Sequence, residues 1–264
     1  MESFRSEIHT HTPKLMPEEQ LVKNLAGQTE RQKSYNLPDF KNILAGWRSQ
    51  IEQQENPEIK NANLALINTV ESLVEYAVAC SWEQKQPQSN WRPINKIKAA
   101  HAAHNTMFTA DALSSYPPLL QKFWHDIFTP LAASGGLSDY EINGWQIGLM
   151  AELAVGKALD KIFAILKKDN LKIYKTTPQE DVKNQRDLVI SSQDSSLPDN
   201  YLQIKVTKGG GDTFVSWVDG QQPTLFMYYN KNINELFNPY TGQPSNALLR
   251  EIVRVLPERF KKAN

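Results

Sequence analysis

Hydrophobic residues recur every three to four positions through the first two thirds of the chain. This spacing predicts helices over residues 40–56, 62–82, 93–113 and 117–128. It continues over residues 138–168, where Ser138 and Glu141 have the spacing typical of a capping box at a helix start. Residues 1–39 are polar and contain several prolines, so we expect an irregular N-terminal arm.

The pattern then changes to short segments in which apolar and polar residues alternate. This alternation predicts strands over residues 171–176, 187–191, 201–207, 214–218 and 224–229, and a helix follows over 245–261. We therefore expect an α/β (α+β) fold, with a mixed central sheet of about five strands flanked by helices and a helical N-terminal half. The expected division is an arm over 1–39, a helical recognition or dimerisation region over 40–135, and a core over 136–264.

Composition narrows the class of protein. The 264 residues include 29 basic and 29 acidic side chains, which does not favour a strongly basic, nonspecific nucleic-acid binder. An enzyme with a local basic cleft stays compatible with this balance. The single cysteine, Cys80, cannot form a disulfide within the chain, and no apolar segment approaches the length of a membrane span. We expect a cytoplasmic protein with no membrane partner.

Candidate chemistry gathers on two of the predicted strands. Asp187 opens one strand, and Gln203 and Lys205 lie two residues apart in the next. Residues two apart on a strand point to the same face, so Gln203 and Lys205 face one way while Leu202 and Ile204 face the core. A carboxylate, an amide oxygen and an ammonium group at one end of a strand pair suit metal-assisted cleavage of phosphodiesters.

A further carboxylate lies on the long helix predicted before these strands. Glu152 falls on the apolar stripe of that helix, seven residues after Trp145 and seven before Leu159. A carboxylate there is costly unless it is paired, hydrogen-bonded or bound to a metal. An ion pair or hydrogen bond with a neighbouring residue is the simple interpretation, and metal binding is the functional one.

The order of a helix with Glu152, a strand, a strand beginning at Asp187 and a strand with Gln203-x-Lys205 resembles the PD-(D/E)XK nuclease superfamily. The resemblance covers residues 138–230. It implies that Asp187, Gln203 and Glu152 ligate Mg²⁺, for which Mn²⁺ can substitute, and that Lys205 contacts the attacking water or the scissile phosphate. Two positions depart from the family pattern: Arg186 stands in place of proline, and Gln203 replaces the usual acid, which removes one negative charge.

The same resemblance implies a metal-dependent DNA endonuclease. A chain of this size without an ATPase motif looks most like a type II restriction endonuclease that cuts double-stranded DNA as a homodimer. One alternative is a repair, recombination or mobile-element nuclease that selects DNA structure. The other is a catalytically inactive nucleic-acid-binding or assembly module in which Gln203 marks a decayed site.

Other residues are weaker candidates for substrate contacts. Lys208, Gly209 and Gly210 follow the Lys205 strand, where backbone amides could approach phosphates, and a plain hairpin loop is the equal alternative. His101 and His104 lie three apart, a spacing that can bind zinc, but a polar helix face with phosphate contacts from His104 and Lys98 is the preferred interpretation. The aromatic residues Phe226 and Tyr228 share one strand face and are expected in the core, with contacts to DNA bases as the alternative.

Overall fold

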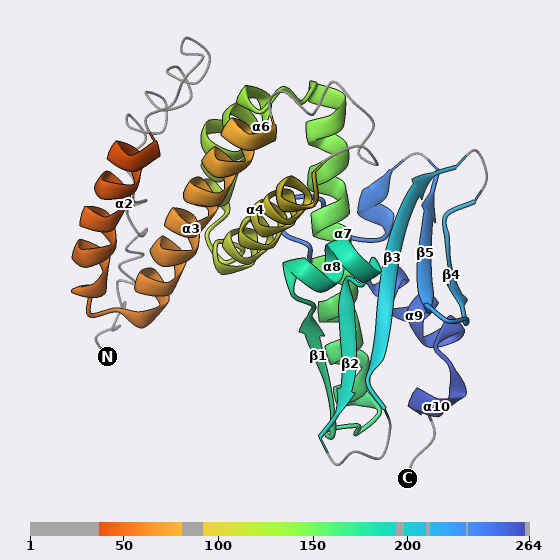
Figure 1. Cartoon of the computed structure of the whole chain (residues 1–264). Coiled ribbons are helices and arrows are strands. Elements are labelled where there is room, and N and C mark those ends of the chain that lie inside the picture. Colours follow the sequence, from red (N-terminus) through yellow and green to blue (C-terminus); the bar gives the residue numbers. More distant parts are fainter. Residues whose placement is uncertain (1–36, 81–91, 194–197, 210–211, 231, 262–264) are drawn as a thin grey trace, which may run out of the picture.

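The computed structural model describes residues 37–80, 92–193, 198–209, 212–230 and 232–261 (Figure 1). It confirms the predicted fold class: helices form the first half, and a five-stranded mixed sheet flanked by helices forms the second. The predicted arm lies almost wholly outside the described residues, and the first described helix already begins at Leu37. One cluster of buried apolar side chains runs through both halves, and the predicted division at residue 135 stays a prediction.

The helical half follows the predicted segments closely. Its helices are α2 (Leu37–Glu52), α3 (Pro57–Cys80), α4 (Pro93–Ala112), α5 (Pro117–Lys122) and α6 (Thr129–Ser134). Between α5 and α6 the chain forms a π-helical turn, η3 (Phe123–Phe128), where the pattern predicts a continuous α-helix. Pro130 explains the wider turn, because its ring lacks an N–H and would crowd the carbonyl four residues earlier in a regular helix.

The long helix α7 (Asp139–Ile165) joins the two halves. Its start is the predicted capping box: the Ser138 hydroxyl accepts a hydrogen bond from the Glu141 N–H, and the Glu141 carboxylate accepts one from the Ser138 N–H. The predicted apolar stripe is buried at Leu149, Leu159 and Phe163. Helix α7 contacts α4 and α6 on the helical side. On the sheet side it contacts the strands β1 (Leu171–Lys175) and β3 (Asn200–Lys208) and the helix α9 (Asn246–Val255).

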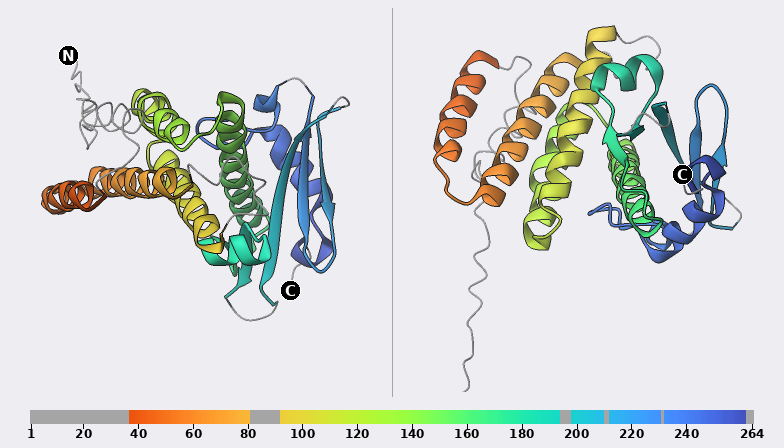
Figure 2. Two further views of the ribbon diagram at one scale, coloured as in Figure 1. Left: turned by 45° about the horizontal axis from the view of Figure 1, so that its top comes forward. Right: turned by 90° about the horizontal axis from the view of Figure 1, so that it is seen from below.

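The five predicted strands are all present. They are β1 (Leu171–Lys175), β2 (Leu188–Ser192), β3 (Asn200–Lys208), β4 (Phe214–Val218) and β5 (Thr224–Tyr229), in the order β1-β2-β3-β5-β4. The pairs β1–β2, β2–β3 and β4–β5 are antiparallel, and β3 runs parallel to β5. Helices α7 and α9 (Asn246–Val255) lie on one side of the sheet, as Figures 1 and 2 show.

Two further elements differ from the prediction. A short helix, α8 (Pro178–Asn184), connects β1 to β2, begins at the capping residue Thr177 and lies against α4. The predicted final helix is instead two helices, α9 and α10 (Glu258–Lys261), because Pro257 cannot continue the hydrogen bonding of α9. None of the described helices is both long and apolar enough to cross a bilayer.

Candidate active site

A cleft of about 1130 Å³ lies between α4, α7, α8 and the sheet. Its walls contain all four residues that the sequence assigns to the catalytic set: Glu152, Asp187, Gln203 and Lys205. They come from three separate elements, namely α7, the residue before β2, and β3. The structure therefore brings together side chains that lie as far apart in the chain as Glu152 and Lys205.

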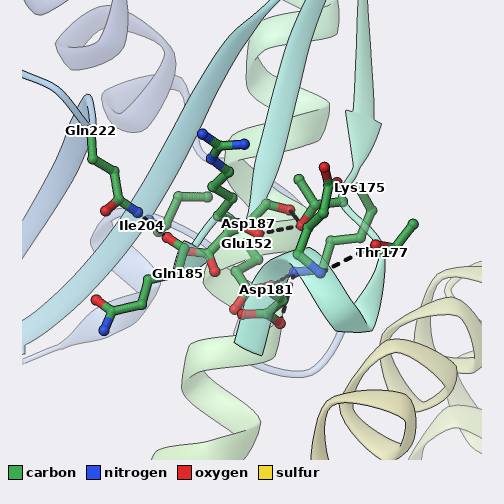
Figure 3. Close-up of polar contacts among 11 residues, drawn as sticks. Glu152, Lys175, Thr177, Asp181, Gln185, Asp187, Ile204 and Gln222 are labelled. Carbon is green, nitrogen blue, oxygen red and sulfur yellow. Dashed lines mark hydrogen bonds and ion pairs between the residues drawn. The ribbon is translucent and has the colours of Figure 1, made fainter. Parts of the chain in front are cut away.

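Asp187 is held at the junction of β2 and β3. Its backbone N–H donates to the Leu202 carbonyl, and its carboxylate oxygen Oδ2 accepts a hydrogen bond of 2.6 Å from the Ile204 N–H (Figure 3). The residue is only 8% exposed. The N–H group that orients the Asp187 side chain thus belongs to Ile204, the residue between Gln203 and Lys205. This hydrogen bond joins the two parts of the predicted motif.

Glu152 is paired with a residue that the sequence analysis did not select. The Lys175 ammonium, at the end of β1, lies 2.5 Å from Glu152 Oε2 and 3.9 Å from Asp181 Oδ2 (Figure 3). The side chains of Lys175 and Glu152 are 7% and 18% exposed. The inward-facing carboxylate is therefore satisfied by an ion pair, which was the simple interpretation of its place on the apolar stripe.

Lys175 and Asp181 are the charged residues of this cluster that sequence reasoning missed. A signal for Lys175 was present: Leu171, Ile173 and Lys175 alternate along β1, so a lysine stands at an inward position. Asp181 lies on α8, a helix of seven residues without a buried side chain, so no apolar periodicity marked it. Its neighbours Thr177 and Glu180 form an N-terminal capping pattern that could have located the helix.

Burial, and to a smaller extent the closeness of other carboxylates, raises the pKa values of Asp187 and Asp181 in the cleft. Burial, followed by the charge of Glu152, raises the pKa of Asp187 to about 7, against the opposing effects of Lys175 and the Ile204 hydrogen bond. Burial also raises the pKa of Asp181. Burial lowers the pKa of Lys175, but the three nearby carboxylates outweigh it, and the net shift is upward. One lysine does not offset the acidic groups around it.

Gln203 is 9% exposed and lies beside the segment that joins α8 to β2. Its Nε2 donates to Gln185 Oε1 over 3.3 Å, and Gln185 has a left-handed backbone with φ of 52°. Gln222 reinforces that segment by donating to the Asn184 and Gln185 carbonyls. Because the Gln203 nitrogen faces Gln185, the amide oxygen is the atom it can offer to a cation.

Lys205 lines the cleft and is exposed. Gln203, two residues earlier on the same strand face, is covered by the Gln185 segment, whereas that cover ends before Lys205. An exposed lysine can contact a substrate that enters from solvent. Among the cleft carboxyls, its positive charge acts to lower the pKa of Asp181.

The weaker substrate-binding candidates have different positions. Lys208 is exposed at the end of β3, and the Gly209 N–H donates to the Tyr229 carbonyl over 3.0 Å. Gly210 lies outside the described residues. On α4, Lys98 is half-buried. The lysine of this helix that lines the cleft is Lys96, two residues earlier.

The assignment of His104 to a polar, phosphate-contacting face is wrong. The side chain is 8% exposed, and among the described residues its Nε2 has no hydrogen-bond partner. Burial, with the nearby charges of Lys175 and His101, lowers the pKa of His104 to about 3. The imidazole is therefore neutral and packs edge-on against Phe108. His101, three residues earlier on the same helix, is exposed.

The donor chemistry of the cleft suits a hard divalent cation. Asp187 and Glu152 supply carboxylate oxygens, and Gln203 supplies an amide oxygen. In the part of the chain that the structure describes, no three His, Cys, Asp or Glu side chains surround one point as metal ligands. The residues fit Mg²⁺ by donor type, with Glu152 already shared with Lys175.

Comparisons with known proteins identify no relative. No protein-family model matches the chain, no curated protein matches it, and no solved structure matches its fold. Membership of the PD-(D/E)XK superfamily therefore stays a prediction that rests on the named residues and on the order of the elements around them.

Proposed function

We propose that the protein is a Mg²⁺-dependent DNA endonuclease that hydrolyses phosphodiester bonds. The observation that supports this is the meeting of Asp187, Gln203, Lys205 and Glu152 in one cleft, as their spacing on strands and helix predicts. Chance resemblance of a short motif does not require its parts to converge, and here an additional acid, Asp181, and a buried lysine, Lys175, join them.

In this proposal Asp187, Gln203 and Glu152 hold the cation through their oxygen atoms. A bound Mg²⁺ would supply an activated water and offset the negative charge that develops on the phosphoryl group. Asp187 is already oriented by its hydrogen bond from the Ile204 N–H, so little side-chain entropy is lost when it becomes a ligand.

The two lysines have separate roles. Lys205 is the exposed cation of the cleft and would hold a phosphoryl oxygen or the attacking water. Lys175 is buried, contacts Glu152 and Asp181, and acts as a positioning residue that keeps the acids at close range before a cation binds. Removing either lysine is expected to reduce activity, but only loss of Lys175 should also reduce stability.

A non-catalytic module is the second candidate, and the ion pair between Lys175 and Glu152 favours it. A lysine that neutralises the helical acid is what a decayed metal site would contain, and Gln203 in place of an acid points the same way. Within the endonuclease proposal, two forms are distinguished by the cleavage assay described next. One is a homodimer that cuts double-stranded DNA at a specific site, as type II restriction endonucleases do, and the other is a nuclease that selects DNA structure.

The decisive experiment incubates plasmid DNA and branched oligonucleotides with the wild type, Asp187→Asn and Lys205→Met, in Mg²⁺ and in EDTA. Cleavage only by the wild type with Mg²⁺ is expected. Asp169→Asn and Lys172→Met, which change exposed charges away from the cleft, are the matched controls. Discrete plasmid fragments would indicate sequence-specific cutting, and cutting at junctions alone would indicate structure selection.

Calorimetric titration with Mg²⁺ and Mn²⁺ provides a readout that does not depend on activity. The wild type should bind the ion and Asp187→Asn should lose most of that binding. If no ion binds and the wild type cleaves none of the substrates with Mg²⁺, the endonuclease proposal is wrong and the non-catalytic module stands.

A further inference from the structure

A row of aromatic rings extends from the cleft over the open face of the sheet. Tyr228 stacks on Phe214 with ring centroids 4.5 Å apart and planes within 22°. Phe226 lies 6.1 Å from Tyr228, with planes within 17°. We call Phe226, Tyr228 and Phe214 the aromatic row.

These rings are not in the core, contrary to the expectation for Phe226 and Tyr228. Leu225 and Met227, which alternate with them on β5, are fully buried, whereas Phe226 and Tyr228 are half-buried and Phe214 is 41% exposed. Helices α7 and α9 pack against the opposite face, and no described helix lies over β4 and β5 on the side of the row (Figures 1 and 2). Apolar side chains that adjoin one another on a protein surface mark binding sites more often than single exposed apolar side chains do.

The strand register connects the row to the cleft. On the parallel pair β3–β5, Lys205 is the partner of Phe226 and Thr207 is the partner of Tyr228. On the antiparallel pair β4–β5, Tyr228 is the partner of Phe214. Partners across strands share a sheet face and lie about 5 Å apart. Lys205, which lines the cleft, is thus the next residue along the sheet surface after Phe226.

An ammonium group followed by near-parallel aromatic rings is the arrangement by which proteins hold unpaired nucleotides. The cation attracts the phosphate backbone, and each ring offers a surface on which a base stacks regardless of its sequence. Bases inside a duplex are already stacked on each other and cannot reach such rings. The row begins beside Lys205, which we propose to contact phosphate, and this position favours a nucleotide over a protein as the bound partner.

We infer that the aromatic row binds unpaired nucleotides of a strand that leaves the cleft past Lys205. The inference rests on the proposed function and narrows its substrate to DNA with a single-stranded segment beside the bond that is cut. It favours structure-selective cleavage over cutting within a fully paired site.

The test measures binding without cleavage. Fluorescence anisotropy in EDTA would compare labelled oligothymidylate, an abasic oligonucleotide of the same length, and a duplex. The double variant Phe214→Leu/Tyr228→Leu keeps apolar volume and removes two rings. It should bind oligothymidylate about tenfold more weakly or worse, since base stacking on one ring is worth a factor of this order. Its affinity for the abasic strand should be unchanged, because that ligand has phosphates and no bases.

Matched variants guard against loss of the fold. Tyr228→Phe keeps the ring and should bind as the wild type does, and Tyr174→Leu removes an exposed ring from β1, at the other edge of the sheet, and should also have no effect. Equal binding of oligothymidylate by the double variant and the wild type would overturn the inference. So would a change in oligomeric state on size-exclusion chromatography, because it would assign the row to a protein contact.

The two proposals fail in different ways. Plasmid cleavage with Mg²⁺ by both the wild type and the double variant, with no ring-dependent binding, would leave the endonuclease and remove the aromatic row as a nucleotide site. Ring-dependent binding of oligothymidylate without cleavage of any substrate would leave the nucleotide site and remove the endonuclease.

Discussion

The Lys175 ammonium lies 2.5 Å from the Glu152 carboxylate, so an ion pair joins the end of β1 to α7 inside the cleft. Asp181 Oδ2 is 3.9 Å from the same ammonium, and the charge of Asp187 also acts on it. Lys175 is therefore the internal counter-ion of three acids. This relationship makes the cleft sensitive to every change of charge within it.

Lys175→Met should destabilise the protein strongly. Removing one partner from a buried ion pair leaves the other charge without compensation, at a cost of about 3 kcal/mol in the free energy of unfolding. Urea unfolding at pH 8 in EDTA measures this cost. Lys172→Met, on the same strand and exposed, should change stability by less than about 0.5 kcal/mol.

A second substitution separates loss of charge balance from loss of packing. Glu152→Gln combined with Lys175→Met removes both charges and should recover most of the stability lost in the single variant. A double variant as unstable as Lys175→Met alone would show that the lysine contributes through its apolar stem rather than through the ion pair.

Asp187→Asn should flatten the pH dependence of stability. The carboxyl titrates near 7 in the native protein and near its ordinary value of 3.8 in the unfolded chain. The native state binds the proton more tightly, so this group's contribution is full below pH 3.8 and is lost as pH rises through 7. Asparagine keeps an acceptor for the Ile204 N–H, and the variant should be more stable than the wild type at pH 8 by on the order of 2 kcal/mol in EDTA.

Unfolding curves from pH 4 to pH 8 test this dependence, with Asp169→Asn as the control. Addition of Mg²⁺ should raise the melting temperature of the wild type at pH 8 and leave that of Asp187→Asn unchanged, since a ligand stabilises only the state that binds it. If the wild type gains more stability than Asp187→Asn between pH 5 and pH 8, burial and the charge of Glu152 do not raise the pKa of Asp187, and the prediction is wrong.

His104→Leu should make the protein less sensitive to acid. The pKa of His104 is about 3 in the native state, below the ordinary value of 6.5, so the unfolded chain binds the proton first as pH falls. Stability is full above pH 6.5 and declines below it, and at pH 5 the loss from this residue is about 2 kcal/mol. Denaturant unfolding at pH 5 and pH 8 measures the difference.

The exposed neighbour provides the control for this prediction. His101→Leu changes a side chain of the same type on the same helix, and its charge is the smallest named cause of the His104 shift, so it should reduce the acid dependence only slightly. If His104→Leu retains the full loss of stability between pH 8 and pH 5, the acid sensitivity arises elsewhere and the buried imidazole is not its source.

Gly242→Ala should destabilise the loop that supports α7 beside the cleft. Gly242 has φ of +59°, and an added Cβ would lie 2.8 Å from Leu153 Cγ, which follows Glu152 on α7. The combined strain and overpacking should cost about 2 kcal/mol in thermal or urea unfolding. Gly46→Ala, with nothing within 4 Å of the new Cβ and a helical backbone, should stabilise the protein by about 0.5 kcal/mol instead.

Most of the elements, and the faces on which the predicted catalytic residues lie, could be predicted from the amino-acid sequence alone. Alternation located all five strands, and the period of α7 placed Glu152 inward, because both periods follow from the local geometry of the backbone. The two-residue step from Gln203 to Lys205 likewise set their shared face. These inferences needed no knowledge of which element lies next to which.

The packing of distant segments determines which neighbours complete the site and which residues are covered. Lys175 reaches Glu152 because β1 packs against α7, His104 is buried, with Lys175 close enough to act on its pKa, and the segment at Gln185 covers Gln203 but not Lys205. The aromatic row lies outside the core, with Phe226 and Tyr228 half-buried and Phe214 exposed, because no described helix lies over its face of the sheet. Burial and ion pairing depend on contacts between distant segments, and periodicity along the chain contains no information about those contacts.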